Sequence, residues 1–120
     1  MARKRIDLAE GLAAFASALE DDGAPRAVVA TAVRWTLQLL EERAPGRTVE
    51  VRVPPHGAVQ VIAGPRHTRG TPPNVIEMNA RTWLELAAGR LEWVAALESG
   101  VISASGARAD LGGLLPLHRA

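Results

Sequence analysis

Cysteine and tyrosine are absent from this chain of 120 residues, which also has one phenylalanine and three tryptophans. Without cysteine there can be no disulfide, no thiolate catalysis and no cysteine-ligated zinc, and this lack is typical of a reducing compartment. Base-stacking surfaces need several exposed rings on one face. So few rings, together with a formal net charge of +1, indicate no nucleic-acid partner.

Long apolar runs are missing as well. No stretch approaches the ~18 apolar residues of a membrane span, so no stable membrane insertion is expected. The basic N-terminus is followed at once by Asp7 and Glu10, which is unlike the apolar core of a signal peptide. We therefore expect a cytoplasmic protein with one domain over residues 1–120, in which a helix within residues 1–23 could be peripheral.

Motifs for metal binding and catalysis are also lacking. His56, His67 and His118 are expected in a turn, a loop and a free tail, without the paired spacing of metal ligands. The sequence has neither a Gly-x-Ser-x-Gly elbow nor a phosphate-binding Walker loop. Glu77, His67 and Arg69 form the one polar set worth considering for catalysis. We therefore expect no enzyme activity, no metal and no cofactor.

Two helices are predicted at the start of the chain. Apolar residues recur at helical spacing over residues 6–22, with Asp7 as the cap. Pro25 then suits the first turn of a longer helix that ends near Arg43. Arg34 is the single charge inside the apolar run of this second helix. It is either a surface arginine or an anion contact at the rim of a pocket.

The rest of the chain alternates strands and short helices. Residues 47–64 predict a β-hairpin that turns at residues 54–57, because valines alternate with polar residues. Asn79 and Gly89 suit the two ends of a short helix, and Asp110 suits the start of a leucine-rich one. The predicted elements after the hairpin are a strand at 75–78, helices at 80–88 and 91–98, a strand at 101–105 and a final helix at 111–117.

A polar loop over residues 64–73 precedes the second half of the chain. It contains Arg66 and Arg69 and ends in two prolines, which direct the chain into the next strand. An arginine fork matches a carboxylate or a phosphate. Arg66 or Arg69 is therefore a candidate contact for an acidic head group, and a solvated surface loop is the alternative.

Residues 74–117 contain an ordered series of features that resembles a known family. A strand leads into a helix that ends in the sequence 87–91, Ala-Ala-Gly-Arg-Leu. A second short helix carries Trp93 and Leu97, and Ser-Gly-Val-Ile (99–102) and Ser-Gly (105–106) follow. This series resembles the C-terminal half of the sterol carrier protein family. Over about residues 25–117 the chain is similar to its small stand-alone bacterial members.

The resemblance implies an α+β fold, with a mixed and mainly antiparallel sheet of about five strands covered by helices on one face. It also implies an apolar tunnel between sheet and helices that binds sterols, fatty acids, acyl-CoA or phospholipid. Residues 111–117 would close this tunnel. The side chains that it places along the tunnel or its closing segment are Trp83, Leu84, Leu91, Val94, Leu97, Leu114 and Leu115.

Two functions follow from the resemblance. The first is non-catalytic binding of a lipid or other small apolar or amphiphilic ligand in that cavity. The alternative is an accessory or dimerisation domain without an open cavity, related to domains fused to bacterial thiol-dependent isomerases or acetyltransferases. In that case Leu8, Leu12 and Phe15 of the first helix would contact a partner, with a homodimer as one possibility.

Overall fold

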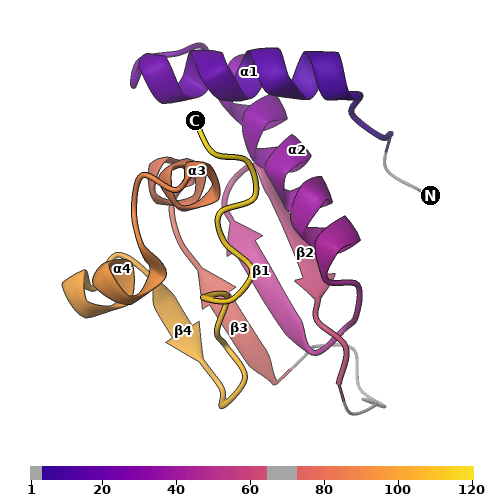
Figure 1. The fold of residues 1–120 in the computed structure, drawn as a ribbon, viewed down its shortest axis with the longest axis vertical. Helices are drawn as coiled ribbons and strands as arrows, with labels where there is room; N and C mark the ends of the chain where they lie inside the picture. Colours follow the sequence, from indigo (N-terminus) through magenta and orange to yellow (C-terminus); the bar gives the residue numbers. More distant parts are fainter. Residues whose placement is uncertain (1–3, 65–72) are drawn as a thin grey trace.

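The computed structural model describes residues 4–64 and 73–120, and within them it has four helices and one four-stranded sheet (Figure 1). This confirms the expected α+β fold. The elements are α1 (Leu8–Glu20), α2 (Arg26–Arg43), β1 (Val49–Val53), β2 (Gly57–Val61), β3 (Asn74–Glu77), α3 (Ala80–Ala88), α4 (Trp93–Ser99) and β4 (Ser103–Ser105).

The sheet is mixed and mainly antiparallel, as expected, although the described residues contribute four strands rather than about five. The strand order is β2-β1-β3-β4. β1 pairs antiparallel with β2 and parallel with β3, and β3 pairs antiparallel with β4. Along β1, Val49, Val51 and Val53 are buried while Glu50 and Arg52 are only half-buried. One face of the sheet is therefore apolar, and the helices cover it (Figure 1).

The helices begin and end largely where the sequence indicates. The Asp7 carboxylate accepts a hydrogen bond from the Glu10 amide at 2.8 Å, and the Asn79 side chain accepts one from the Thr82 amide at 2.8 Å. Each bond satisfies an amide that has no partner inside its helix. α1 packs on α2 through Gly11, where an added Cβ would lie 2.2 Å from Cγ of Trp35. Only glycine therefore allows this crossing.

The space between the sheet and the helices is densely filled. Val51 and Ile76 on the sheet, Trp83 and Leu86 on α3, and Leu111 near the C-terminus have no accessible surface. Since a water-sized void would expose the side chains around it, no such void touches these residues. Along these residues no apolar tunnel separates the sheet from the helices, and Leu111, expected to help close such a tunnel, is itself part of the core.

The C-terminal segment (residues 107–120) is not a helix, and the prediction of a helix at 111–117 is wrong. Asp110 caps a single turn instead: its carboxylate accepts from the Gly112 amide at 2.8 Å, and the Leu114 amide donates to the Leu111 carbonyl at 2.9 Å. Gly112 is followed by a second glycine, and each glycine destabilises a helix by about 1 kcal/mol relative to alanine. Pro116 also lacks the amide needed to continue one.

The last residues of the chain are docked rather than free. The amides of Leu117 and His118 both donate to the Ala87 carbonyl, at 2.9 and 3.1 Å. The His118 ring lies edge-on against Phe15 and Trp35, with ring centres 6.1 and 5.9 Å away. The C-terminal segment thus runs from β4 across the helix-covered side of the sheet to α1 and α2 (Figure 1).

Candidate functional site

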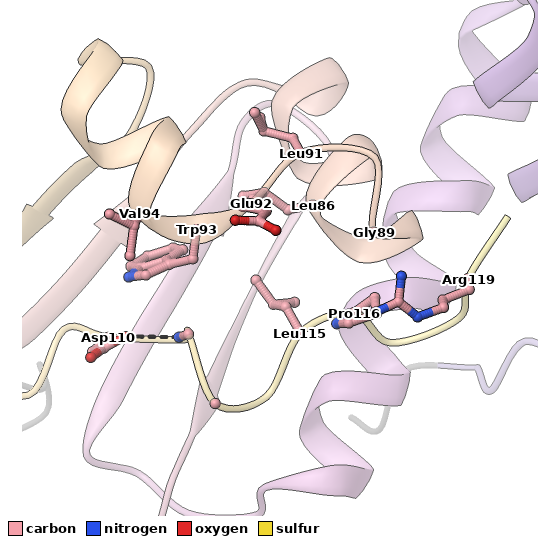
Figure 2. Close-up of a pocket in the computed structure, with 12 residues that line it drawn as sticks. Leu86, Gly89, Leu91, Glu92, Trp93, Val94, Asp110, Leu115, Pro116 and Arg119 are labelled. Carbon is pink, nitrogen blue, oxygen red and sulfur yellow. Dashed lines mark hydrogen bonds between the residues drawn. The ribbon is translucent and has the colours of Figure 1, made fainter.

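A pocket of about 500 Å³ lies between the link from α3 to α4 and the C-terminal segment (Figure 2), and we name it the α3–α4 groove. Apolar side chains line it from both sides. Those on the helix side are Leu91, Trp93 and Val94, and those on the C-terminal segment are Leu115 and Pro116, while Leu86 borders the pocket without exposed surface.

The helix side of the groove follows from the way α3 ends. Gly89 adopts the left-handed conformation with φ +81°, which stops the helix. The amides of Arg90 and Leu91 then both turn back to the Glu85 carbonyl. This tight turn brings Leu91 to the groove, where it is half-buried, and starts α4 at Trp93.

The opposite side of the groove is held by hydrogen bonds to two helices. Carbonyls at a helix C-terminus lack partners within the helix, and the C-terminal segment supplies them for α3 through Leu117, His118 and Ala120. From α2, the Arg43 guanidinium donates to the Leu114, Pro116 and Leu117 carbonyls at 2.8 to 3.2 Å. This irregular wall is therefore fixed in place.

Gly89 also determines how closely the two sides approach. A Cβ at this position would lie 3.0 Å from Nη1 of Arg119 and 3.2 Å from Cβ of Pro116. Real Cβ atoms rarely approach other atoms this closely, and the positive φ is a second reason for glycine. The residue that ends α3 therefore also allows the C-terminal segment to pass beside it.

Three charged side chains lie at the rim of the groove. Figure 2 places Arg119 at one end, beside Gly89, and Asp110 at the other, with the Glu92 carboxylate between them. No group of three histidine, aspartate or glutamate side chains in the described part of the chain could hold a metal ion. The arrangement can therefore contact an apolar body along its walls and a polar group at its rim.

The structure brings three of the predicted ligand-binding residues together. Leu91, Val94 and Leu115 all line the groove. Trp83 and Leu84 lie in the core instead, with 0% and 2% of their surface exposed. The Trp83 ring nitrogen donates to the Thr36 hydroxyl at 2.7 Å, which ties α3 to α2. Trp83 and Leu84 thus hold the fold and do not face the groove.

The other four predicted site residues lie elsewhere. Leu97 is exposed on α4, and Leu114 is half-buried with its carbonyl bound to Arg43. Neither lines the groove. Arg66 and Arg69 lie outside the described residues, as does His67 of the polar set considered for catalysis.

Sequence reasoning missed the polar part of the groove. The sequence favours Asp110 as a helix cap and places Arg119 in the tail next to His118. Glu92 lies within the helix predicted at 91–98, where a glutamate is ordinary and signals no site. The sequence contains one signal of this outcome, the glycine pair 112–113. Two adjacent glycines disfavour a helix, and so they indicate that residues 111–117 are irregular.

Comparisons with known proteins agree with the fold. A family model described as "Bacterial SCP ortholog" matches residues 25–117. The match contains α2 to β4 and most of the C-terminal segment, whereas α1 and Arg119 lie outside it. A search of curated proteins finds no match. Over residues 4–64 and 73–120, no helix combines the length and apolarity needed to cross a membrane.

Proposed function

This chain belongs to the bacterial sterol carrier protein (SCP)-like family, and from that membership we propose that it binds a lipid or another small amphiphile, without catalysis, in the α3–α4 groove. The observation that carries the proposal is that apolar side chains of two separate segments face one pocket of about 500 Å³. Small-molecule sites typically occupy about 300–1,000 Å³, so the groove is of a size to hold a ligand.

The driving force is the removal of apolar ligand surface from water, at roughly 25 cal/mol per Å². Leu91 and Leu115 are half-buried on opposite walls, and Val94 is 62% exposed. These side chains still have apolar surface that a ligand can cover. A close-packed core residue such as Trp83 has none. The groove rather than the interior is therefore the place where an apolar body gains most.

The charged side chains at the rim are expected to determine the orientation of the ligand. A head group that emerges near Arg119 meets a guanidinium, whereas one that emerges near Asp110 meets a carboxylate. Arginine holds carboxylates and phosphates through paired hydrogen bonds. An acidic amphiphile is therefore expected to lie with its head toward Arg119 and its chain toward Trp93.

Two valines offer a matched test. Val94 lines the groove, while Val101 lies outside it, and both are well exposed, at 62% and 44%. Val94→Asp is expected to weaken the binding of decanol, a neutral probe, at least tenfold, because a carboxylate must then lose water beside the ligand. Val101→Asp should leave the affinity within a factor of two. Methyl chemical shifts of Leu91 and Leu115 follow the titration.

Equal effects of the two substitutions, or decanol shifts that avoid both leucines, would remove the proposal. The accessory-domain alternative is favoured by the dense interior and by the exposed stripe of Val94, Leu97 and Val101. Of the three α1 residues expected at a partner, Phe15 is 1% exposed and Leu12 is half-buried, whereas Leu8 is 64% exposed and has surface that a partner can cover. If the stripe is a dimer interface, light scattering shows a dimer that both aspartate variants convert to a monomer.

A further inference from the structure

A second pocket, of about 660 Å³, lies away from the α3–α4 groove, beside the edge strand β2. We name it the N-terminal hollow. Its walls are the segment before α1, one face of α2 and the turn between β1 and β2. The residues that matter for its chemistry are Ile6, Glu10, Arg34, Glu41, His56 and Val59.

The wall before α1 is fixed to α2. The Gln38 amide group accepts a hydrogen bond from the Ile6 amide at 3.0 Å and donates one to the Ile6 carbonyl at 2.9 Å. Arg5 forms an ion pair with Glu42. These contacts hold the N-terminal segment along α2. Both this segment and α2 therefore form fixed walls of the hollow.

Arg34 is held in a set orientation at one end of the hollow. Its Nε–H donates to the His56 carbonyl oxygen at 3.1 Å. That bond uses one edge of the guanidinium and leaves the two terminal nitrogens with no partner among the described residues. A guanidinium whose terminal donors are free can hold an oxyanion through two parallel hydrogen bonds, and the bond to His56 favours the orientation that presents them.

Positive charge gathers at this same end. Arg26 lies two helical turns before Arg34 on α2, and neither forms an ion pair in the described part of the chain. Burial, then repulsion from Arg26 and Arg34, lowers the pKa of His56. The nearest carboxylate of the hollow on α2 belongs to Glu41, seven residues after Arg34 and so roughly 10 Å further along the helix. Glu10 of α1 also lines the hollow, and among the described residues neither Glu10 nor Glu41 forms an ion pair with Arg26 or Arg34.

We propose that the N-terminal hollow binds a small molecule that carries an oxyanion, a carboxylate or a phosphate. The anion lies on the terminal nitrogens of Arg34 beside His56, and the body of the molecule lies toward the half-buried Ile6. This site shares no residue with the α3–α4 groove. It therefore stands or falls independently of the function proposed there.

Titration of the whole chain with inorganic phosphate, acetate and hexanoate, at constant ionic strength, tests the proposal. We expect saturable chemical-shift changes at the Arg34 Nε–H and the His56 ring. Because an anion stabilises the imidazolium, saturation should raise the pKa of His56. Phosphate binding alone would assign a phosphate ligand. Hexanoate binding at least fivefold tighter than acetate binding would assign an apolar carboxylate.

Arginine variants supply the specificity control. Arg34→Gln is expected to weaken binding at least tenfold, and Arg34→Lys to weaken it several-fold, because lysine keeps the charge but loses the planar fork. Arg47→Gln removes the same charge at the opposite end of β1, where Arg47 donates to Gln60 at 3.1 Å. It should leave the affinity within a factor of two. Amide spectra verify that each variant is folded.

Shifts that rise linearly with anion concentration would overturn the proposal, as would equal weakening by Arg34→Gln and Arg47→Gln. Either result would mean that anions only screen the protein's surface charge. Binding of acetate and hexanoate with equal affinity, without phosphate binding, would overturn the part assigned to Ile6.

Discussion

The α3–α4 groove and the N-terminal hollow are built in different ways. The hollow combines one face of α2 with the segment before α1 and the turn between β1 and β2, and its arginine, Arg34, lies on the helix and is oriented by the backbone of the adjacent turn. The groove joins Leu91 to Leu115, and one of its walls has no regular secondary structure. Within a helix the backbone hydrogen bonds themselves set the direction of each side chain, whereas the polar backbone groups of an irregular wall need partners elsewhere in the molecule. The two pockets should therefore respond differently to the same perturbation.

The largest effect is expected from Leu111→Ala. Leu111 has no exposed surface and anchors the C-terminal segment in the core. A buried leucine truncated to alanine costs about 2–5 kcal/mol of unfolding free energy. Decanol affinity in the groove should fall with it, while phosphate binding in the N-terminal hollow stays unchanged. Urea denaturation and the two titrations measure these quantities.

Leu115→Ala is the matched control, because this leucine is half-buried on the same segment. It should cost clearly less stability than Leu111→Ala and still weaken decanol binding. If the two substitutions destabilise the protein equally, Leu111 does not anchor the wall as described.

The elements that the sequence predicts well are those decided by neighbouring residues. Asp7 and Asn79 cap helices, and Gly89 and Gly100 end them with positive φ. The alternating valines form the predicted hairpin. In each case the deciding hydrogen bond or dihedral lies within a few residues of the signal. Local chemistry is sufficient there.

The C-terminal segment shows where that reasoning stops. Asp110 and the leucines after it favour a helix locally. The segment instead follows distant partners, since its carbonyls bind Arg43 and its amides bind Ala87 and Ala88. These partners lie about 30 to 70 residues away in the chain. No pattern within the segment reveals them.

The residues of the two candidate sites also differ in whether neighbouring residues or distant partners reveal them. Arg34 stands out in the sequence as a lone charge in an apolar helix, and it lies at the edge of a pocket. In α3 and α4, apolar bulk marks both core and groove residues. Trp83 and Leu84 turned out to be core, whereas Leu91 and Val94 line the groove. Only the path of the C-terminal segment distinguishes the two sets.

Arg43→Gln is expected to cause the second-largest loss of stability. Its guanidinium binds three carbonyls of the C-terminal segment at the solvent-exposed side of the molecule. We expect a loss of about 1–3 kcal/mol, because hydrogen bonds from charged groups contribute more than neutral ones but solvent competes at this position. The amides of Leu117 and His118 should exchange hydrogen faster.

Arg43→Lys tests whether the shape of the guanidinium matters. Lysine keeps the charge but cannot reach three carbonyls with one planar fork. Most of the loss should therefore remain. Arg47→Gln again serves as the neutral comparison, with a change within about 0.5 kcal/mol expected for such a surface site. Full recovery of stability in the lysine variant would show that charge alone holds the segment.

The smallest effect concerns pH and belongs to the N-terminal hollow alone. The pKa of His56 in the folded chain lies below its usual value of 6.5, because burial disfavours the charged ring and Arg26 and Arg34 repel it. The unfolded chain therefore binds the proton more tightly. Above pH 6.5, His56 is neutral in both the folded and the unfolded chain and costs no stability. As the pH falls from 6.5 to the folded pKa, the unfolded chain takes up the proton first, so the free energy of unfolding decreases.

Comparing His56→Gln with the unchanged chain isolates this contribution from the other groups that titrate. The substitution should flatten the decline of unfolding free energy below pH 6.5. Arg34→Gln should raise the pKa of His56, since it removes one of the two repelling charges. Saturating phosphate, if it binds beside Arg34, should raise this pKa further than Arg34→Gln does, because it adds negative charge as well as screening the positive charge. An unchanged His56 titration in Arg34→Gln would contradict the charge arrangement on which the hollow's assignment rests.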